Sequence, residues 1–480
     1  MSILKKILNK SKNNNKIIFK DDNYLYREFY ADTLSIYKKL KKLKVHNKVL
    51  VICSNYSKNY LALIFAAYKA NYLIVLLNRS SAEKEKLFII KNSGASLVFS
   101  DQILFVKKYK KISNFYVYKF KIKHKPLQKG DRFLIYTSGT TSKPKGVILT
   151  DRSITSNIRA ISKDLKLKKK DSSIIFSPPN YAMAISQVFT YMYNEMSFVF
   201  IPSGLRFPSN IVHVIIKYKI NVINLSISAL RILKTILYKK KNFLKHVKIV
   251  MAGGIQMTSN DLLQYKKIFT NSNIINFYGC TENSPRISHY HINKKKNYTI
   301  VPVGRPLKGV KVKINKLKGK YGKILISGTS LMRGYFNIER KKNFIQKRWF
   351  NTGDIGYFNK NNEIVLYRRE DDTFRVGHEK LAPEEIEPVI KKELDLSELI
   401  ISKKVNKILN WEPVLVILNK DKYKIDIDKI KTKMNKYLSN YKIPKEICTL
   451  YDFPKNSYGK IDRKKIYEEI QKKIKRKKKI

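Results

Sequence analysis

Residues 136 to 147 read Tyr-Thr-Ser-Gly-Thr-Thr-Ser-Lys-Pro-Lys-Gly-Val. An apolar run lies on each side of this stretch, at residues 133–136 and 147–149, which predicts a loop between two buried strands. The loop combines hydroxyl side chains, two lysines and two glycines around one proline. Glycines let backbone N–H groups point at an anion, hydroxyls add donors, and lysine adds positive charge. The stretch therefore predicts a phosphate-binding loop within an α/β fold.

Two other interpretations of this loop are weaker. A Walker A loop would place Lys and then Ser or Thr directly after the last glycine, but Gly146 is followed by Val147. A solvated surface loop is the second alternative, and such loops rarely carry so many donors between apolar strands.

The formal net charge of +63 taken alone suggests a protein that binds nucleic acid or an anionic membrane surface. The basic residues are mostly lysines, however, and they are spread along the whole chain with an excess of Asn, Ile and Tyr. These amino acids share A/T-rich codons, so drift of the genome's base composition explains the charge. No localised arginine stripe or nucleic-acid motif is visible, and we expect no dedicated nucleic-acid partner. A basic protein that binds nucleic acid or membrane surfaces without catalysis remains an alternative.

Compartment and membrane association follow from the apolar runs and the cysteines. The best candidate for a membrane span, residues 60–77, is interrupted by Lys69 and Asn71, so we expect no transmembrane segment. The N-terminus lacks the apolar core and cleavage site of an export signal. The three cysteines lie far apart, which suggests neither a disulfide framework nor a zinc site. We therefore expect a cytoplasmic protein.

The chain is long enough, at 480 residues, for two domains. From about residue 17 to 370, short apolar runs alternate with amphipathic stretches, which predicts an α/β fold with largely parallel sheets. Residues 304–357 are richer in short strands and turns, which suggests a small β-barrel. After residues 369–372 the pattern changes to a compact α+β unit with a helix opening at Pro383. We predict a large N-terminal domain, residues 1–370, and a smaller, mobile C-terminal domain, residues 371–480. The clearest predicted strands are residues 49–52, 72–76, 96–99, 174–176, 198–201 and 248–251.

Three further motifs carry groups suited to a nucleotide. Residues 276–283, Asn-Phe-Tyr-Gly-Cys-Thr-Glu-Asn, follow an apolar strand and place the carboxylate of Glu282 at its C-terminal edge, the usual ligand side of α/β sheets. Asp354 lies between two glycines, where its carboxylate can accept hydrogen bonds from a ribose diol. Lys460 follows Gly459 on a loop that can reach into a distant cleft. Taken singly, each could also be a surface residue.

In the same order, these motifs resemble those of the adenylate-forming superfamily of acyl-CoA synthetases, luciferases and peptide-synthetase adenylation domains. The family's phosphate loop reads Thr-Ser-Gly-Thr-Thr-Gly-x-Pro-Lys-Gly, and this chain departs from it only at Ser142. Residues 278–282 resemble the family's Tyr-Gly-x-Thr-Glu motif. Residues 457–463 resemble its Ser/Thr-x-Gly-Lys-Ile-x-Arg motif, and residues 368–372 resemble its Gly-Arg-x-Asp-Asp hinge, with Arg368 in the glycine position.

The resemblance implies ATP, Mg²⁺ and a thiol acceptor, either CoA or the phosphopantetheine of an acyl carrier protein. It implies that Lys460 bridges the substrate carboxylate and the α-phosphate, that Glu282 coordinates Mg²⁺, and that Tyr278 stacks beside adenine. Thr281 would touch the α-phosphate, and Asp354 would bind the ribose. The implied catalytic residues are Lys460, Thr137 and Glu282. The implied nucleotide-binding residues are Ser138, Gly139, Thr140, Thr141, Lys145, Gly253, Tyr278, Gly279, Thr281, Asp354 and Arg369.

Departures from the family pattern concern the hinge and the acyl pocket. Asp371 would be the hinge residue, but the Gly-x-Arg loop that follows it in the family is altered here at residues 377–380. This change casts doubt on how the second half-reaction is supported, and a relic that binds ATP without turnover is one alternative.

The family's Pro-x-x-His-x-x-Gly motif is replaced at residues 178–184, which makes Tyr181 a candidate gate over the acyl pocket, although a core tyrosine is nearly as good an interpretation. Ala182 stands where amino-acid-activating relatives carry aspartate. We therefore expect a small-molecule carboxylic acid of unspecified chain length without an α-ammonium group, either fatty or aryl, with amino-acid adenylation as the alternative.

Overall fold

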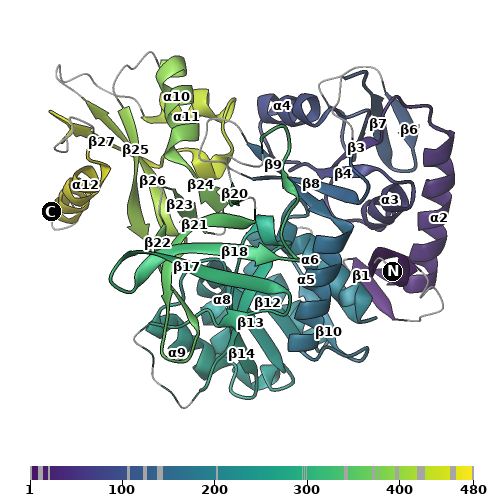
Figure 1. Ribbon diagram of the computed structural model, residues 1–480, viewed down its shortest axis with the longest axis horizontal. Coiled ribbons are helices and arrows are strands. Elements are labelled where there is room, and N and C mark those ends of the chain that lie inside the picture. Colours follow the sequence, from purple (N-terminus) through teal and green to yellow (C-terminus); the bar gives the residue numbers. More distant parts are fainter. Residues whose placement is uncertain are drawn as a thin grey trace. The chain divides into compact units, whose positions relative to one another are not determined.

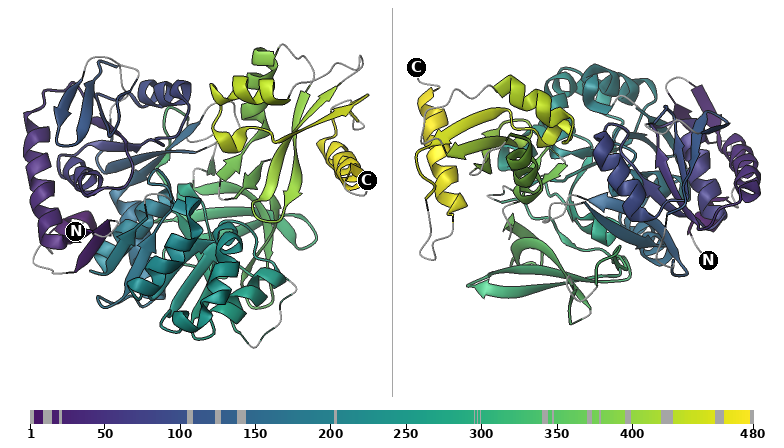
Figure 2. Two further views of the ribbon diagram at one scale, coloured as in Figure 1. Left: turned by 180° about the vertical axis from the view of Figure 1, so that it is seen from behind. Right: turned by 90° about the horizontal axis from the view of Figure 1, so that it is seen from above.

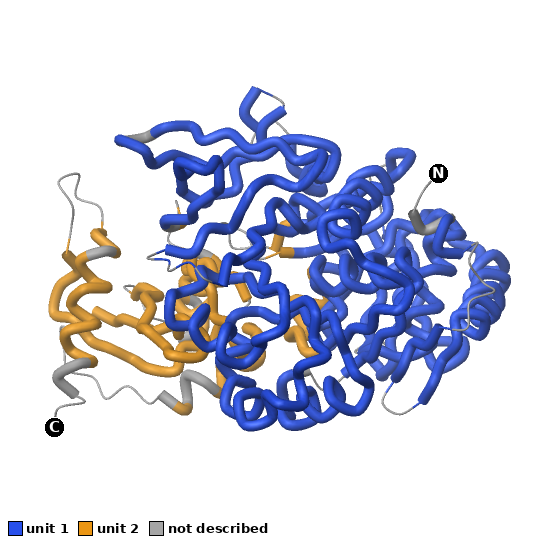
Figure 3. The backbone as a smooth tube through the Cα atoms, turned by 90° about the horizontal axis from the view of Figure 1, so that it is seen from below, with its two compact units in different colours: residues 1–79, 89–136, 146–368 blue, residues 80–88, 137–145, 369–480 orange. Residues whose placement is uncertain are grey.

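The computed structural model describes residues 3–8, 15–19, 22–104, 109–122, 127–137, 144–201, 204–294, 296, 298, 300–339, 344–346, 348–369, 373–377, 379–394, 399–418, 427–454 and 461–477. The chain forms two compact units (Figure 3). Unit 1 comprises residues 1–79, 89–136 and 146–368, and unit 2 comprises residues 80–88, 137–145 and 369–480. The domain division at residues 370 and 371 stays a prediction.

The largest sheet of unit 1 has nine strands (Figure 1). Its strand order is β16 (Arg305–Pro306), β15 (Arg286–His291), β14 (Asn273–Gly279), β13 (Ile249–Gly253), β12 (Val222–Ser226), β10 (Ser172–Ile175), β11 (Ser197–Phe200), β1 (Lys16–Phe19) and β2 (Asp22–Leu25). From β14 to β1 the pairings are parallel, and the strands outside them are antiparallel. The parallel strands are short apolar runs, as expected when helices cover both faces of a sheet.

Helices cover both faces of this sheet. Helices α5 (Asp151–Asp164) and α6 (Ala182–Tyr193) pack on one face, in a core shared with Met251 and Phe277. Helices α7 (Pro208–Lys217), α8 (Ile227–Lys239) and α9 (Ser259–Ile268) pack on the other face, in a core shared with Ile223 and Leu225. Because side chains alternate along a strand, Asn224 lies on the α5 and α6 side of β12.

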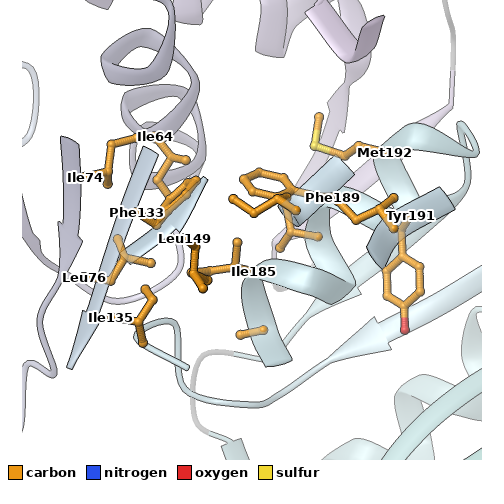
Figure 4. Packing of buried hydrophobic residues seen from close by; sticks show 14 of the residues in the cluster. Ile64, Ile74, Leu76, Phe133, Ile135, Leu149, Ile185, Phe189, Tyr191 and Met192 are labelled. Atoms are coloured by element: carbon orange, nitrogen blue, oxygen red, sulfur yellow. The ribbon is translucent and has the colours of Figure 1, made fainter. Parts of the chain in front are cut away.

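An eight-stranded sheet completes the α/β part of the chain. Its order is β19 (Gly334–Tyr335), β9 (Lys145–Thr150), β8 (Asp131–Thr137), β4 (Leu73–Leu76), β3 (Val49–Cys53), β5 (Leu97–Ser100), β7 (Phe115–Lys119) and β6 (Lys110–Ile112). The accompanying helices are α2 (Tyr26–Lys42), α3 (Lys58–Lys69) and α4 (Glu83–Ser93), whereas α1 (Ile3–Leu8) contacts α5 and α6. Figure 4 shows Phe133 of β8 and Leu149 of β9 beside Phe189 of α6, within one buried cluster. The two strands predicted around the phosphate loop are therefore confirmed.

The region predicted as a small β-barrel forms a five-stranded sheet. Its order is β17 (Val310–Lys318), β18 (Tyr321–Gly328), β21 (Trp349–Phe358) and β20 (Phe344–Ile345), and β22 (Ile364–Arg369) also pairs with β21. Among the described residues these pairings leave the sheet open, because β20 has two residues and pairs only with β21. Its strand-rich character was predicted correctly, but the described pairings do not close a barrel.

Unit 2 contains an α+β fold, as predicted. Strands β24 (Glu379–Leu381), β23 (Phe374–Val376), β26 (Asn410–Leu418) and β25 (Leu399–Asn406) form its sheet, and β27 (Glu446–Leu450) pairs with β26. Its helices are α10 (Pro383–Leu394), α11 (Ile427–Asn435) and α12 (Arg463–Lys477), the last being the yellow helix near the C label in Figure 2. The predicted helix start at Pro383 is confirmed. In the described ranges of the whole chain, no helix combines the length and apolar character needed to cross a membrane.

Candidate active site

The C-terminal end of β14 carries the first group of predicted site residues. Gly279 ends this strand, and a Cβ atom there would lie 2.1 Å from the carbonyl oxygen of Pro285, so only glycine fits this close approach. The amide of Cys280 donates to the same carbonyl oxygen at 3.0 Å. A short 3₁₀ helix follows, η3 (Thr281–Asn283), which contains Thr281 and Glu282. The turn therefore holds Glu282 at the strand's carboxyl end, the edge predicted from the sequence.

Asp354 of β21 lies beside this strand end. The hydroxyl of Tyr278 donates to Oδ2 of Asp354 at 2.5 Å. The Asp354 amide donates to Oγ1 of Thr352 at 3.1 Å, and that hydroxyl donates to the carbonyl of Ile324 at 2.9 Å. Burial and then the Asp354 charge raise the pKa of Tyr278 well above its usual range, so the phenol stays neutral and donates. Two motifs 76 residues apart thus meet in one hydrogen bond.

Glu282 is held by Tyr335, which the sequence analysis did not single out. The hydroxyl of Tyr335 donates to Oε1 of Glu282 at 2.7 Å. Tyr335 lies opposite Val147 in the pairing of β19 with β9, and the Phe336 amide donates to the Gly146 carbonyl at 2.7 Å. Glu282 is therefore fixed to the strand that directly follows the predicted phosphate loop. Only the preceding Gly334 marks Tyr335 in the sequence.

Cys280 lies close enough to both carboxylates to be influenced by their charges. Burial is the main reason that the pKa of its thiol is raised well above the usual range, and the charges of Glu282 and Asp354 add to the effect. A thiol held neutral in this way is a poor nucleophile, so we assign Cys280 no covalent role. The site instead concentrates negative charge at the end of β14.

The donor set fits a magnesium ion that arrives with a nucleotide. Among the described residues, no group of three or more His, Cys, Asp or Glu side chains could hold a metal ion. Mg²⁺ commonly takes one or two protein carboxylates and completes its octahedron with phosphate oxygens and water. Glu282, oriented by Tyr335, supplies one such carboxylate.

Two glycines, Gly253 and Gly254, lie at the C-terminal end of the neighbouring strand, β13. A Cβ atom at Gly253, which ends β13, would lie 2.5 Å from the ring of Phe277. Gly254 follows with a φ of +92°, a conformation that other residues rarely adopt. The close approach of Phe277 therefore explains why residue 253 is glycine, and the nucleotide-binding role of Gly253 stays a prediction.

Tyr181 and Ala182 stand at the start of α6. Tyr181 is the N-cap residue, its amide donates to the Pro178 carbonyl at 3.2 Å, and its side chain is partly buried against the core. Ala182 is buried, and the first turn of α6 contains no acidic residue. This turn therefore offers no carboxylate to pair with an ammonium group.

The remaining predicted residues divide into two sets. Thr137 ends β8, Lys145 begins β9 and Arg369 ends β22, and all three belong to unit 2. The others lie outside the described residues: Ser138, Gly139, Thr140, Thr141, Asp371 and Lys460. Pro454 and Asp462 flank the segment that contains Lys460, and the Asp462 amide donates to the Pro454 carbonyl at 2.7 Å. The ends of that segment are thus held together, and the residue roles stay predictions.

Comparison with known protein families identifies the family of this chain. Residues 4–336 match the family model described as AMP-binding enzyme, which is more than half of the chain. The chain belongs to the AMP-binding enzyme family. It is similar to zwittermicin A synthase ZmaJ of Bacillus cereus, with 23% identity over 93% of this chain and 90% of the relative. It is also similar to 2-succinylbenzoate–CoA ligase of Bacillus subtilis, with 22% identity over 94% of each chain. Some relatives are much longer, and the matched region is only 7% of a linear gramicidin synthase polypeptide of Brevibacillus parabrevis.

Solved structures agree on the fold. The amide bond synthetase McbA from Marinactinospora thermotolerans superposes with a TM-score of 0.85 at 15% identity, covering 98% of this chain and 99% of that chain. The o-succinylbenzoate CoA synthetase from Bacillus subtilis superposes with a TM-score of 0.82 at 21% identity, covering 97% of this chain and 98% of that chain. The predicted resemblance and α/β fold class are confirmed. The chain is an adenylate-forming ligase of the acid–thiol type.

Proposed function

We propose that this ligase activates a small carboxylic acid with MgATP and then transfers the acyl group to a thiol. The observation that carries the proposal is the hydrogen bond between Tyr278 and Asp354, close to Glu282 in unit 1. An aromatic ring, a carboxylate for a diol and a carboxylate for a metal ion are the groups that adenine, ribose and magnesium phosphate require.

The first half-reaction forms an acyl-adenylate. A carboxylate oxygen of the substrate attacks the α-phosphorus of ATP, and the bond to pyrophosphate breaks. Asp354 would accept hydrogen bonds from the ribose hydroxyls while Tyr278 holds its other side, and Lys460 would stabilise the negative charge that develops at the α-phosphate. Glu282 would hold Mg²⁺, which when bound neutralises phosphate charge.

The second half-reaction transfers the acyl group. The sulfur of the thiol attacks the acyl carbon, AMP leaves, and the thiol proton passes to solvent or a base. We favour CoA as the acceptor over the phosphopantetheine of a carrier protein, because the similarity to 2-succinylbenzoate–CoA ligase of Bacillus subtilis extends over 94% of each chain. The formal charge of +63 would steer either anionic partner, so charge alone does not discriminate between them.

Amino-acid adenylation is the second candidate, since zwittermicin A synthase ZmaJ is similar over nearly the whole chain. The start of α6 argues against it. Ala182 is buried and no acidic residue stands in the first turn, so an α-ammonium group placed there would lack a counter-charge. Burying such an ammonium costs several kcal/mol, about 3–5 by analogy with broken buried pairs.

Product analysis tests the proposed reaction. The protein is incubated with MgATP, a carboxylic-acid panel, and either CoA or a phosphopantetheinylated carrier protein over a salt series. We expect AMP, pyrophosphate and an acyl-CoA thioester in equal amounts. Formation of ADP and phosphate would contradict the AMP-forming assignment. A thioester on the carrier protein alone, at every salt concentration, would contradict the choice of CoA.

A further inference from the structure

Among the described residues of unit 1, the buried cation Arg286 has no counter-charge. Arg286 is the first residue of β15, four positions after Glu282, and is 4% exposed. Its guanidinium carbon lies 3.5 Å from the centre of the Phe277 ring. Its main-chain amide donates to Oδ1 of Asn157 at 3.1 Å, and its carbonyl accepts from the side-chain amides of Asn157 and Asn283. Within the part of the chain that the structure describes, its guanidinium forms neither an ion pair nor a hydrogen bond.

Other shielded arginines of this chain have a carboxylate partner. Arg231 donates two hydrogen bonds of 2.8 Å to Asp261, and Arg463 donates to both oxygens of Glu387 at 2.8 and 2.7 Å. Arg333 donates to Asp131 at 2.8 Å. A buried charge without a partner is costly, so proteins seldom retain one without a use. Burial lowers the pKa of Arg286 to about 9, which leaves it charged at neutral pH.

The surroundings of Arg286 are polar on one side. Tyr191 of α6 lies close enough to influence its charge, and the Tyr191 hydroxyl interacts with Ser173 and Gln187. Figure 4 shows the Tyr191 hydroxyl turned away from the apolar cluster. The side-chain oxygen of Gln187, the residue that contacts the Tyr191 hydroxyl, is buried and accepts no hydrogen bond from described residues. An unsatisfied polar atom one contact away from an unpaired cation is consistent with a place that a polar ligand completes.

Arg286 is also joined directly to the candidate active site. It lies opposite Gly279 in the pairing of β14 with β15, and its Cα is 3.3 Å from where a Cβ on Gly279 would stand. The Phe277 ring beneath its guanidinium is the ring that covers Gly253 and directly precedes Tyr278 in the chain. The cation therefore stands beside the strand end that we assign to the adenylate, on the same sheet face as α6.

We propose that Arg286 binds a second carboxylate of the substrate, so that the acid activated by this enzyme is a dicarboxylic acid. This inference rests on the proposed function. A planar guanidinium matches a carboxylate with two parallel hydrogen bonds, and the Phe277 ring holds the guanidinium flat for that purpose. A plain fatty or aryl monoacid would leave the cation buried against an apolar group. The expectation of a fatty or aryl acid thereby narrows to acids with a carboxylate at each end, aliphatic or aromatic.

The chemistry is balanced without a further reactant. One carboxylate attacks the α-phosphorus of ATP and pyrophosphate leaves, as in the general reaction. The distal carboxylate stays ionised on Arg286 throughout, and no electron or proton is transferred there. Arg286 therefore acts in substrate selection and positioning and takes no part in bond making.

The test compares matched acids that differ only at the far end, such as hexanoate with adipate and benzoate with terephthalate. In acid-dependent ATP–pyrophosphate exchange, we expect the best diacid to exceed its monoacid partner in kcat/KM by at least about tenfold. Arg286→Leu should lower kcat/KM for the diacid by roughly a hundredfold and leave the monoacid unchanged or improved. The kcat/KM of Arg286→Lys for the diacid should lie between the values of the parent and of Arg286→Leu, because lysine keeps the charge and lacks the planar guanidinium. Arg206→Leu is the matched control, since that exposed guanidinium lies 5.7 Å from the Phe207 ring.

A binding measurement separates this inference from the proposed function. Arg286→Leu should melt at a higher temperature than the parent when no ligand is present, because an unpaired buried charge is removed. Each diacid of the panel is tested in turn, and at least one should raise the melting temperature of the parent and leave that of Arg286→Leu unchanged. Failure of every acid to support exchange would contradict the proposed function, and the melting shift would still test Arg286. Equal use of diacids and monoacids by the parent, or an unchanged ratio in Arg286→Leu, would overturn the role of Arg286.

Discussion

The hydroxyl of Tyr278 donates a hydrogen bond of 2.5 Å to Oδ2 of Asp354. The two residues belong to different sheets, since Tyr278 lies in β14 of the nine-stranded sheet and Asp354 in β21 of the five-stranded sheet. The bond orients the carboxylate and keeps the tyrosine ring beside it. In the proposed function, Tyr278 stacks beside the adenine of ATP and Asp354 accepts hydrogen bonds from its ribose.

This pair predicts non-additive effects on ATP use. Tyr278→Phe retains the ring and removes the bond, so the KM for ATP should rise about tenfold, as expected for a hydrogen bond to a charged group. Asp354→Asn should raise it further, and the double variant should show a coupling energy of about 1–3 kcal/mol. Steady-state exchange kinetics over an ATP series measure these values. Tyr290→Phe is the control, because the Tyr290 hydroxyl of the parent lies 3.0 Å from that of Tyr298. Additive effects of Tyr278→Phe and Asp354→Asn on the KM for ATP would contradict the predicted coupling.

Glu282 and Tyr335 predict a graded dependence on magnesium. Glu282→Gln should lower activity strongly and raise the Mg²⁺ concentration that gives half-maximal exchange, with partial recovery at high Mg²⁺. Tyr335→Phe removes only the bond that orients the carboxylate, so the shift should be about tenfold, the lower end of such effects. Tyr367→Phe serves as the control, because the Tyr367 ring is exposed and lies tilted against the ring of Tyr321. Unaltered Mg²⁺ dependence in Glu282→Gln would rule out its proposed role.

Lys460 predicts a separation of the two half-reactions. Lys460→Ala should slow acyl-adenylate formation by about two to three decades, the size of effect seen when one electrostatic donor to a developing charge is lost. Thioester formation from a supplied acyl-adenylate should be largely preserved. Lys465→Ala, at an exposed position of α12, is the control in this lysine-rich chain. Exchange at the parent rate in Lys460→Ala would show that another group stabilises the transition state.

The start of α6 predicts poor use of amino acids. Ala182 and the first turn of α6 offer no carboxylate to an α-ammonium group, so each proteinogenic amino acid should be activated at least about tenfold less well than the best acid without that group. Pairs such as glutamate and glutarate isolate the effect of the ammonium group. An amino acid that outperforms its deaminated partner would move the assignment to amino-acid adenylation.

Two buried carboxyl groups in unit 2 predict that its stability decreases as the pH rises from about 4.5 to 7. Burial is the main cause that raises the pKa of Glu379 to about 7, with the charge of Glu85 adding to it and that of Lys442 opposing it. The pKa of Glu385 is also raised to about 7 by burial, although Lys442 lies 3.1 Å from its carboxylate. The folded state keeps these protons while the unfolded state loses them near pH 4.5, so stability is greatest at low pH and decreases until about pH 7.

The unit carries its own optical probe for this prediction. Trp411 lies in β26 of unit 2, and the other tryptophan, Trp349, lies in β21 of unit 1, so Trp349→Phe leaves a fluorescence signal from unit 2. In that background, Glu379→Gln should raise the midpoint of thermal unfolding at pH 8 and change it little at pH 5. Glu469→Gln, on the exposed side of α12, should change neither. A midpoint that is lower at pH 8 in Glu379→Gln than in the parent would contradict the prediction.

The strands were predictable because each is a short apolar run bounded by polar residues. The strand predicted at residues 49–52 corresponds to β3 (Val49–Cys53), and the strand predicted at residues 248–251 overlaps β13 (Ile249–Gly253). These strands can be recognised from the local sequence, because a parallel strand that is covered on both faces consists of consecutive apolar residues. Closure of residues 304–357 as a barrel was not decided locally, because it depends on pairing between distant strands.

Distant contacts also explain which site residues the sequence could not reveal. Tyr335 lies 53 positions from Glu282, and no local spacing shows that its hydroxyl contacts that carboxylate. Arg286 is one basic residue among 99, so its unpaired burial is visible only in the folded chain. Glu282 and Asp354 were predicted because the glycine and turn patterns around them are themselves informative, and their roles stay predictions.

Acid-dependent ATP–pyrophosphate exchange tests the central claim most directly. Purified protein is incubated with MgATP, labelled pyrophosphate and, in separate reactions, each acid of a panel of monoacids, diacids and amino acids. The account predicts that label enters ATP only when an acid is present, that at least one acid without an α-ammonium group supports it, and that Asp354→Asn and Lys460→Ala reduce it. Exchange that is independent of acid, or absent with every acid at saturating Mg²⁺, would contradict the assignment as an adenylate-forming ligase that activates carboxylic acids.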